Sequence, residues 1–317
     1  MQRIRSLLFI IIGLLSSQAF FLGSANAAQI SGGDGYRISP VRSDLTIARG
    51  NSQIVNFYIK NVTNTTEHVQ TLVNDFVASN KQNGTPSLLL NGQQAPSHGL
   101  KQYIIVKTPT FTLNPQQQLT IPVEVSIPKT IAPGGYYAAV RFAPTGLSGK
   151  QNVNLSASVA SLVLVTVPGN YLQQMNITNF SVNQNGRAGT LFTTSKNLTA
   201  TVSFNNSGQV QEEPFGKFIL LKGNQQIGTY PINNVNPPGN VLPNSIRSFT
   251  VNLNNLQGFG KYSVEGYFGY GSNGQLLSSK KTFYLIPYNM LFMAIIIIVL
   301  ILILLILLVR KMHKTKK

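Results

Sequence analysis

Few residues in this sequence have the type and spacing needed for chemistry. Its 317 residues include 3 histidines, 8 acidic residues and no cysteine. His68 and His98 do not lie in a zinc-ligand spacing, so solvated or capping roles are predicted for both. Calcium loops require clustered acidic residues, and the sequence has no such cluster. We therefore expect no metal and no cofactor.

Two further patterns look like catalytic motifs. Glu212 and Glu213 are neighbours, so on a strand they face opposite sides, and we interpret them as a solvated turn before Pro214. Residues 269–274 match G-x-G-x-x-G, but a dinucleotide site needs a helix after the glycines. A strand pattern follows instead, which predicts a hairpin turn. With no G-x-S-x-G motif present, we expect no catalytic residue, no small-molecule substrate and no enzyme; the ligand-binding residues remain unknown.

An apolar segment stands near each end of the sequence, and the residues between these segments must position any site. Residues 290–309 form a run of 20 apolar residues, enough to cross a hydrocarbon core of about 30 Å as a helix. The basic residues that follow favour a cytoplasmic tail. We predict a transmembrane helix at 288–309 and a cytoplasmic basic tail at 310–317. The protein is then single-pass in the plasma membrane, with its N-terminal domains extracellular.

The N-terminus predicts export. Arg3 and Arg5 precede a short apolar run, and Ala25-Asn26-Ala27 is a small-x-small cleavage site. We predict a signal peptide at 1–27, with an uncleaved N-terminal anchor as the alternative. Both interpretations place the middle of the chain outside the cytoplasm.

The exported segment, residues 28–287, has the size of two domains. The absence of cysteine excludes a disulfide framework and favours a bacterial surface. This segment carries 18 basic and 8 acidic residues, a net charge of about +10. That charge attracts an anionic lipid or wall-polymer surface, although a purely solubilising charge is the alternative. Because the basic residues are scattered, no nucleic-acid partner is expected.

Alternating apolar and polar residues between turn signals predict an all-β ectodomain. Asn83-Gly84, Asn91-Gly92, Asn185-Gly186 and Asn273-Gly274 are the strongest turn signals. The predicted strands of the first half are 53–60, 68–78, 103–107, 119–127, 136–143 and 153–167. Those of the second half are 176–183, 198–205, 217–222, 227–231, 248–253, 262–270 and 276–286.

The two halves repeat one plan. In each, a Gly-x-Tyr strand, at Tyr136 and at Tyr262, follows an alternating strand. This resembles the tyrosine corner of immunoglobulin-like sandwiches, with Ala138 and Val264 in place of the antibody cysteines. We predict two tandem Ig-like β-sandwich domains, residues 28–168 and 169–287, followed by one C-terminal transmembrane helix. The short linker predicts domains standing end to end with limited swing.

The first half is longer than the second between matching positions. The extra residues are assigned to 79–102, which is rich in Gly, Asn, Gln, Pro and Ser. A long loop on a rigid sandwich is a common place for binding, and a poorly ordered surface excursion is the equal alternative.

Short motifs in the first domain resemble those of periplasmic pilus chaperones. They are Ile38-Ser39-Pro40-Val41-Arg42, the strand end at Asn61, and residues 110–115 and 127–129. Those chaperones are soluble, unlike this chain. Arg42 is the candidate for one residue of their subunit-capping basic pair, and no lysine partner is found.

The overall plan is similar to the WxL-interacting protein family of Gram-positive surfaces, which has a signal peptide, two Ig-like domains, one span and a basic tail. Residues 133–137, 241–247 and 258–262 carry the resemblance, together with Tyr270-Gly271. It implies peptidoglycan binding by the first domain and protein binding by the second, and it identifies no binding residue.

The sequence thus favours a non-enzymatic, membrane-anchored cell-surface protein that binds cell-wall polymer (peptidoglycan), another surface protein, or both. One alternative is a membrane-tethered chaperone or assembly factor that pairs along a sheet edge. Another is an accessory subunit of a membrane complex.

Overall fold

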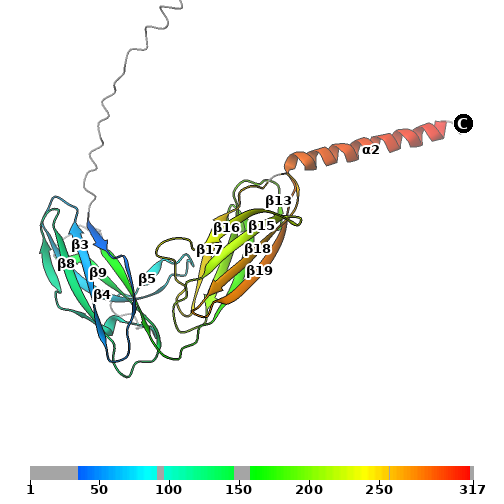
Figure 1. Ribbon diagram of the computed structural model, residues 1–317. Coiled ribbons are helices and arrows are strands. Elements are labelled where there is room, and N and C mark those ends of the chain that lie inside the picture. The colour runs from blue at the N-terminus through cyan, green and yellow to red at the C-terminus, as the bar shows by residue number, and fades with distance from the viewer. Residues whose placement is uncertain (1–34, 91–95, 146–157, 257, 315–317) are drawn as a thin grey trace, which may run out of the picture.

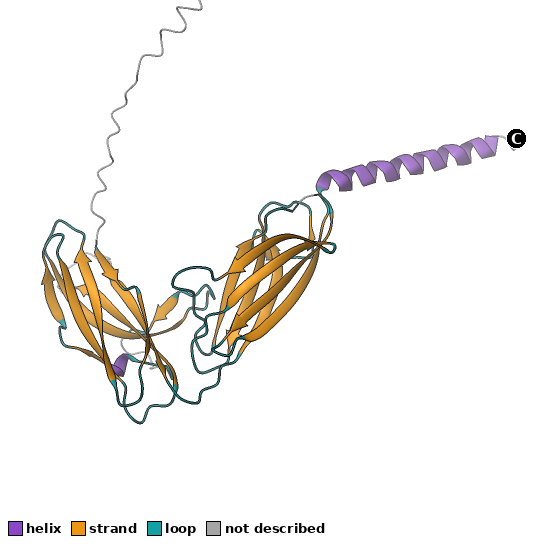
Figure 2. Cartoon of the chain, in the orientation of Figure 1, coloured by secondary structure: helices purple, strands orange, loops and turns teal. Residues whose placement is uncertain are grey.

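The computed structural model describes residues 35–90, 96–145, 158–256 and 258–314. Two β-sandwiches meet at an angle, and the helix α2 (Tyr288–Lys314) leaves the far end of the second one (Figures 1 and 2). The predicted fold class is confirmed: the chain is all-β, with two Ig-like sandwiches followed by one apolar helix. The domains form a V, so the expectation of an end-to-end arrangement is wrong. The predicted signal peptide lies outside the described residues.

The first sandwich packs two sheets face to face. One has the order β1 (Tyr36–Ser39), β3 (Ser52–Asn61), β8 (Gln118–Ser126) and β6 (Ile104–Val106), with the short 3-10 helix η1 (Lys101–Tyr103) just before β6. The other has the order β2 (Arg42–Thr46), β10 (Val159–Val167), β9 (Gly134–Pro144), β4 (Glu67–Ala78) and β5 (Pro86–Leu88), and β7 (Thr110–Leu113) also pairs with β4. The first strand therefore changes sheets at Pro40, and β2 pairs with β10 in parallel.

The second sandwich repeats this plan. One sheet has the order β12 (Arg187–Ala188), β11 (Met175–Gln184), β14 (Leu198–Asn206) and β17 (Ser245–Asn252). The other has the order β13 (Leu191–Phe192), β19 (Gln275–Leu285), β18 (Gly260–Tyr270), β15 (Phe215–Lys222) and β16 (Gln225–Ile232). Here too the early strand β13 joins the last strand in parallel.

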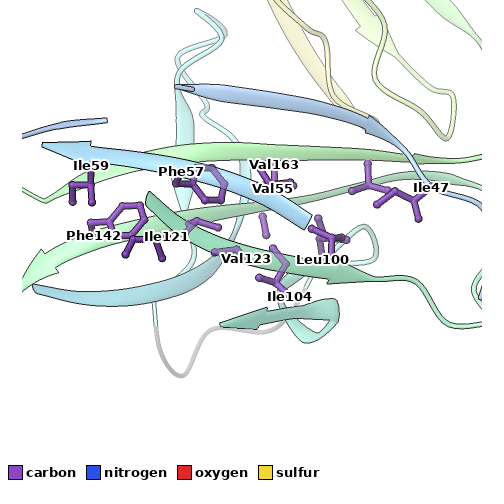
Figure 3. Close-up of a cluster of buried hydrophobic side chains, with 14 of the residues drawn as sticks. Ile47, Val55, Phe57, Ile59, Leu100, Ile104, Ile121, Val123, Phe142 and Val163 are labelled. Carbon is purple, nitrogen blue, oxygen red and sulfur yellow. The ribbon is translucent and has the colours of Figure 1, made fainter. Parts of the chain in front are cut away.

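The alternation of β3 positions the first core. Val55, Phe57 and Ile59 point between the sheets, as the pattern predicts, and Phe57 and Ile59 are fully buried (Figure 3). The Phe57 ring meets the Phe142 ring of β9 edge-on, with 6.2 Å between their centroids. Burial of such side chains is the main stabilising term in a chain without disulfides.

The second core is built around a group of phenylalanines. Phe268 of β18 contacts Phe204 of β14 at 5.2 Å and Phe218 of β15 at 5.4 Å between ring centroids. These edge-to-face contacts join both sheets of the sandwich.

Both tyrosine corners are confirmed. The Tyr136 hydroxyl donates to the carbonyl of Ala132 at 2.9 Å, and the Tyr262 hydroxyl donates to the carbonyl of Gly258 at 3.1 Å. Each bond reaches back four residues along the chain and fixes the corner before its strand. Ala138, which replaces the antibody cysteine in the first sandwich, is fully buried.

Of the described Asn-Gly signals, Asn185-Gly186 forms a two-residue hairpin, whereas Asn83-Gly84 and Asn273-Gly274 lie in the longer turns 79–85 and 271–274. Asn185 and Gly186 both have positive φ, which is required for a two-residue hairpin of this type. Gly271 and Gly274 lie in the predicted turn between β18 and β19, and Gly269 is still part of β18. Asn91-Gly92 lies outside the described residues.

Removal of the second corner hydroxyl tests this architecture. We expect Tyr262→Phe to lower the free energy of unfolding by about 1 kcal/mol, because a part-buried hydrogen bond is lost while the ring stays packed. Thermal or urea unfolding of the full chain measures the change. The control is Tyr267→Phe, whose hydroxyl bonds Glu265 at the surface; an equal loss in both variants would contradict the structural role of the corner.

Candidate functional site

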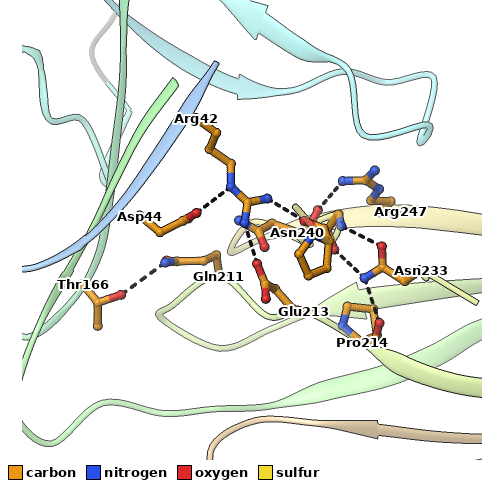
Figure 4. A network of polar contacts seen from close by, with 11 residues as sticks. Arg42, Asp44, Thr166, Gln211, Glu213, Pro214, Asn233, Asn240 and Arg247 are labelled. Atoms are coloured by element: carbon orange, nitrogen blue, oxygen red, sulfur yellow. Dashed lines mark hydrogen bonds and ion pairs between the residues drawn. The ribbon is translucent and has the colours of Figure 1, made fainter. Parts of the chain in front are cut away.

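The junction between the two sandwiches is centred on Arg42, the first residue of β2 (Figure 4). Its Nε donates to Asp44 at 2.7 Å and its Nη2 donates to Glu213 at 2.7 Å. Its Nη1 donates to the carbonyl of Pro238. Only 11% of the Arg42 side chain is exposed. One guanidinium therefore ties the first sandwich to two loops of the second.

The second sandwich organises its side of this contact with its own polar side chains. The Asn233 amide donates to the carbonyls of Pro214 and Gly239 at 2.8 and 2.9 Å, which holds the loop that presents Pro238. Arg247 donates to the carbonyl of Asn240 at 2.9 Å. Burial, and secondarily the nearby Arg42, lower the pKa of Arg247.

The interpretation of Glu212 and Glu213 as a solvated turn is wrong for Glu212, whereas the Glu213 side chain is 41% exposed. Glu213 makes the interdomain ion pair with Arg42. Glu212 is buried, pairs with Val241 through an isolated β-bridge, and accepts a hydrogen bond from Gln173 at 3.0 Å. Burial raises the pKa of Glu212, and the hydrogen bond from Gln173 opposes that shift. Adjacent residues do face opposite ways, but each finds a partner distant in sequence.

A second set of contacts lies directly beside the linker. The Gly135 N–H donates to the carbonyl of Gln209 at 2.8 Å. The Tyr137 hydroxyl donates to the Gln211 side-chain oxygen at 3.0 Å, and the Gln211 amide donates to Thr166 at 3.1 Å. Burial raises the pKa of Tyr137, which therefore stays a neutral donor. Both strands β9 and β10 are thus bonded to the second sandwich.

The described part of the predicted insertion 79–102 is neither a free binding loop nor a surface excursion. The β4–β5 hairpin reaches the second sandwich, where the Ser248 N–H of β17 donates to the carbonyl of Gln82 at 2.7 Å. Gly84 has a φ of +80°, which favours glycine, and a β-carbon there would stand 2.0 Å from the Arg247 guanidinium carbon, so the arginine side chain would have to move. Residues 91–95 are outside the description.

An apolar cluster fills the inside of the V. Phe76, Tyr137, Ala139 and Leu164 of the first sandwich are buried there, and Leu242 of the second packs against them. A cavity of about 190 Å³ follows this seam between the sandwiches. The junction is therefore closed by apolar contact as well as by ion pairs.

Exposed apolar side chains stand next to this junction. Val41, Phe215 and Val235 are 61%, 58% and 66% exposed. Val41 precedes Arg42, Phe215 follows Glu213 by two residues, and Val235 lies in the loop that presents Pro238. The Phe215 ring lies over Gly269, where a β-carbon would come within 2.4 Å of it, so the missing side chain at Gly269 leaves room for this exposed ring.

The histidines make local contacts. His68 Nδ1 is 3.1 Å from the Thr112 hydroxyl, and His98 Nδ1 is 2.8 Å from the carbonyl of Gly135. Across the described ranges, no group of three or more metal-ligating side chains is found. Arg42, the candidate taken from the chaperone resemblance, does lie at the junction, and each of its three nitrogens already donates one hydrogen bond within the protein.

No protein-family model matches the sequence, and no curated protein matches it significantly. Solved structures of fimbrial chaperones are similar to it. A chain of the CFA/I chaperone–tip adhesin complex has 15% identity and a TM-score of 0.39, covering 80% of this chain and 99% of its own. The class 5 fimbrial chaperone CfaA has 13% identity and a TM-score of 0.38, covering 80% and 100%. The E. coli chaperone DraB has 15% identity and a TM-score of 0.36, covering 79% and 97%.

These solved structures are neighbours in fold alone. The WxL resemblance stays a prediction. Because every TM-score is below 0.5, the site rests on the contacts of this chain alone.

The helix α2 meets the length and composition of a membrane span. Tyr288–Leu308 has a mean hydropathy of 3.8 over its most apolar window, and none of that window is buried against the rest of the protein. An apolar helix of this kind is stable where lipid covers it. The structure thus has one candidate single-pass anchor in the part that it describes.

Loss of the Arg42 guanidinium tests the junction. We expect Arg42→Met to lower the stability of the paired sandwiches by about 1–2 kcal/mol and to separate their unfolding into two transitions. Calorimetry of the full chain in detergent measures both effects. Lys107→Met is the control, because it breaks an ion pair with Glu124 inside one sandwich; a single unchanged transition in Arg42→Met would contradict the assigned contact.

Glu212 predicts a pH dependence. Its raised pKa means that the folded chain holds the proton more tightly than the unfolded chain, whose ordinary value is 4.5. Its stabilising contribution is therefore present below pH 4.5 and is lost as pH rises through the raised value. As the pH rises from 4.5 through the raised pKa, the melting temperature of the wild type should fall relative to that of Glu212→Gln. A difference that stays constant with pH would show that Glu212 titrates normally.

Proposed function

We propose that this chain is a non-enzymatic, membrane-anchored surface protein that binds another surface protein at the junction of its two sandwiches. The proposal rests on the junction that Arg42 holds together and on the exposed apolar side chains beside it. These side chains, Val41, Phe215 and Val235, are called the apolar rim below. In this proposal residues 1–27 are a signal peptide, 28–168 and 169–287 are the two domains, and 310–317 remain in the cytoplasm.

The geometry of the junction supports protein recognition. Val41, Phe215 and Val235 belong to elements that Arg42 holds together, so they keep their positions without a partner. Binding to such a surface costs little ordering of side chains, and apolar anchors surrounded by polar groups are typical of protein interfaces. An exposed aromatic ring, such as that of Phe215, is a common energetic centre of such an interface.

Several sheet edges discourage strand addition, whereas β13 pairs with the long strand β19 only at Tyr284 and Leu285. β2 covers β10 from Leu162 to Thr166, and Gln82 occupies the edge of β17 at Ser248. The edge strand β16 carries Pro231 and a register shift beside it, two features that discourage pairing.

Peptidoglycan is the second candidate partner, and it is supported by the WxL resemblance and the positive charge of the exported segment. Wall polymer would be bound mainly through charge, whereas a protein would use the apolar rim. The two partners can therefore be separated by experiment.

Site-specific photo-crosslinking tests the proposal in cells that make the full chain. A photoreactive amino acid at Phe215 or Val235 should give a discrete protein adduct. The matched control is Ile54, which is 58% exposed on the outer face of the first sandwich and should give none. Arg42→Met should weaken the adduct because the rim loses its fixed geometry.

Co-sedimentation with isolated wall sacculi completes this test. The proposal expects the adduct to persist after the wall is digested. A chain that pellets with sacculi and gives no adduct at either rim position would replace the protein partner with wall polymer.

A further inference from the structure

We propose that the end of the second sandwich next to α2 is a docking surface for anionic lipid headgroups. The inference rests on the proposed function in one respect, namely that α2 crosses the membrane. It adds a lipid class and a fixed orientation of the second domain on the bilayer.

The distance to the membrane is set by a short link. β19 ends at Leu285 and α2 begins at Tyr288, so two residues join the sandwich to the span. The Ile286 N–H also donates to the carbonyl of Phe192 at 2.8 Å, which holds the link to β13. Two extended residues reach about 7 Å, so this end of the sandwich must lie at the headgroups.

The strand register identifies what else lies at this end. Leu285 pairs with Gly260 at the start of β18, and Lys222 at the end of β15 pairs with Tyr262. Leu191 pairs with Tyr284. The β11–β12 hairpin belongs to the same end, because the Asn185 N–H bonds the carbonyl of Asn197.

The charges at this end have one sign. Its basic residues are Arg187, Lys196, Lys222 and Lys261, all of them exposed. The acidic residue nearest to them along the strands is Glu265, which lies farther up β18 and is paired with Lys280 at 2.7 Å. The other seven acidic residues of the chain lie in the first half or at positions 212 and 213, at the opposite end of the second sandwich. A positive surface held within a Debye length of anionic lipids is attracted to them.

Exposed apolar and aromatic side chains accompany these charges. Leu191, Phe259, Tyr284 and Tyr288 are 61%, 59%, 46% and 69% exposed. Aromatic rings with basic residues are the composition of protein surfaces that lie at the headgroup level. The opposite end of this sandwich differs, since Glu212 and Glu213 give it mixed charge. Charge complementarity and continuity with the span therefore indicate lipid as the occupant.

Labelling the full chain with an environment-sensitive fluorophore tests the surface. Because the sequence has no cysteine, single cysteines can be introduced freely. The probe position is Ser195→Cys, beside Lys196. The aqueous control is Leu276→Cys, at the other end of β19 and 83% exposed. Leu300→Cys reports the span. Each protein is reconstituted in vesicles of phosphatidylcholine alone or with about 30% phosphatidylglycerol, with spin-labelled lipid as quencher.

We expect the label at position 195 to be blue-shifted and quenched at least twofold more with phosphatidylglycerol, while the label at 276 stays aqueous in both lipids. Lys196→Glu with Lys261→Glu should remove that difference. Lys101→Glu with Lys129→Glu makes the same change in charge on the first sandwich and should leave it intact. The label at 300 should be quenched throughout.

Two results would overturn the inference while leaving the anchor in place, provided that the label at 300 is quenched. In the first, the label at 195 is aqueous with and without phosphatidylglycerol. In the second, the label at 195 is equally shielded in the two lipid compositions. Shielding of 195 in lipid-free detergent would also overturn it and indicate a protein contact. An aqueous label at 300 would overturn the anchor itself, and the docking surface with it.

Discussion

A guanidinium that is nearly removed from solvent must keep its partners, and Arg42 has partners in both sandwiches. Leaving such a charge unpaired is far more costly than the net gain from forming the pair, so the arrangement resists separation. Three features depend on the sandwiches staying together. They are the angle of the V, the apolar cluster between the sandwiches, and the hydrogen bond that joins the β4–β5 hairpin to Ser248. The exposed rim at Phe215 has a defined shape for the same reason.

Much of the fold can be predicted from the sequence because it depends on local patterns. Alternation in β3 places Val55, Phe57 and Ile59 inside, and the two Gly-x-Tyr steps predict corners whose hydroxyl bonds the structure shows. The short strands β1, β2, β5, β7, β12 and β13 were not predicted. They carry too few residues for a period to be visible, and their pairing is decided by distant strands.

The junction was harder to predict for a physical reason. Nothing in the sequence around Glu213 shows that it pairs with Arg42, which lies 171 positions earlier. The polar composition of residues 79–90 is typical of a loop, yet a hairpin with Gly84 against Arg247 uses the same residues to bridge two domains. Composition reports solubility and turn propensity, whereas contacts between domains depend on surfaces that exist only after each sandwich has folded. The proposed function needs a fixed shape and little chemistry, and a two-residue link joins that shape to the candidate membrane span.

The central claim is that the two sandwiches form one rigid unit. Pulsed electron paramagnetic resonance measures it most directly, with spin labels at Lys60→Cys in the first sandwich and Tyr267→Cys in the second, on the otherwise unmodified full chain in membranes. The account predicts one narrow distance distribution that stays the same at low and at high salt, because the junction is closed by apolar contacts as well as ion pairs. A broad distribution, or one that widens as salt is added, would contradict it.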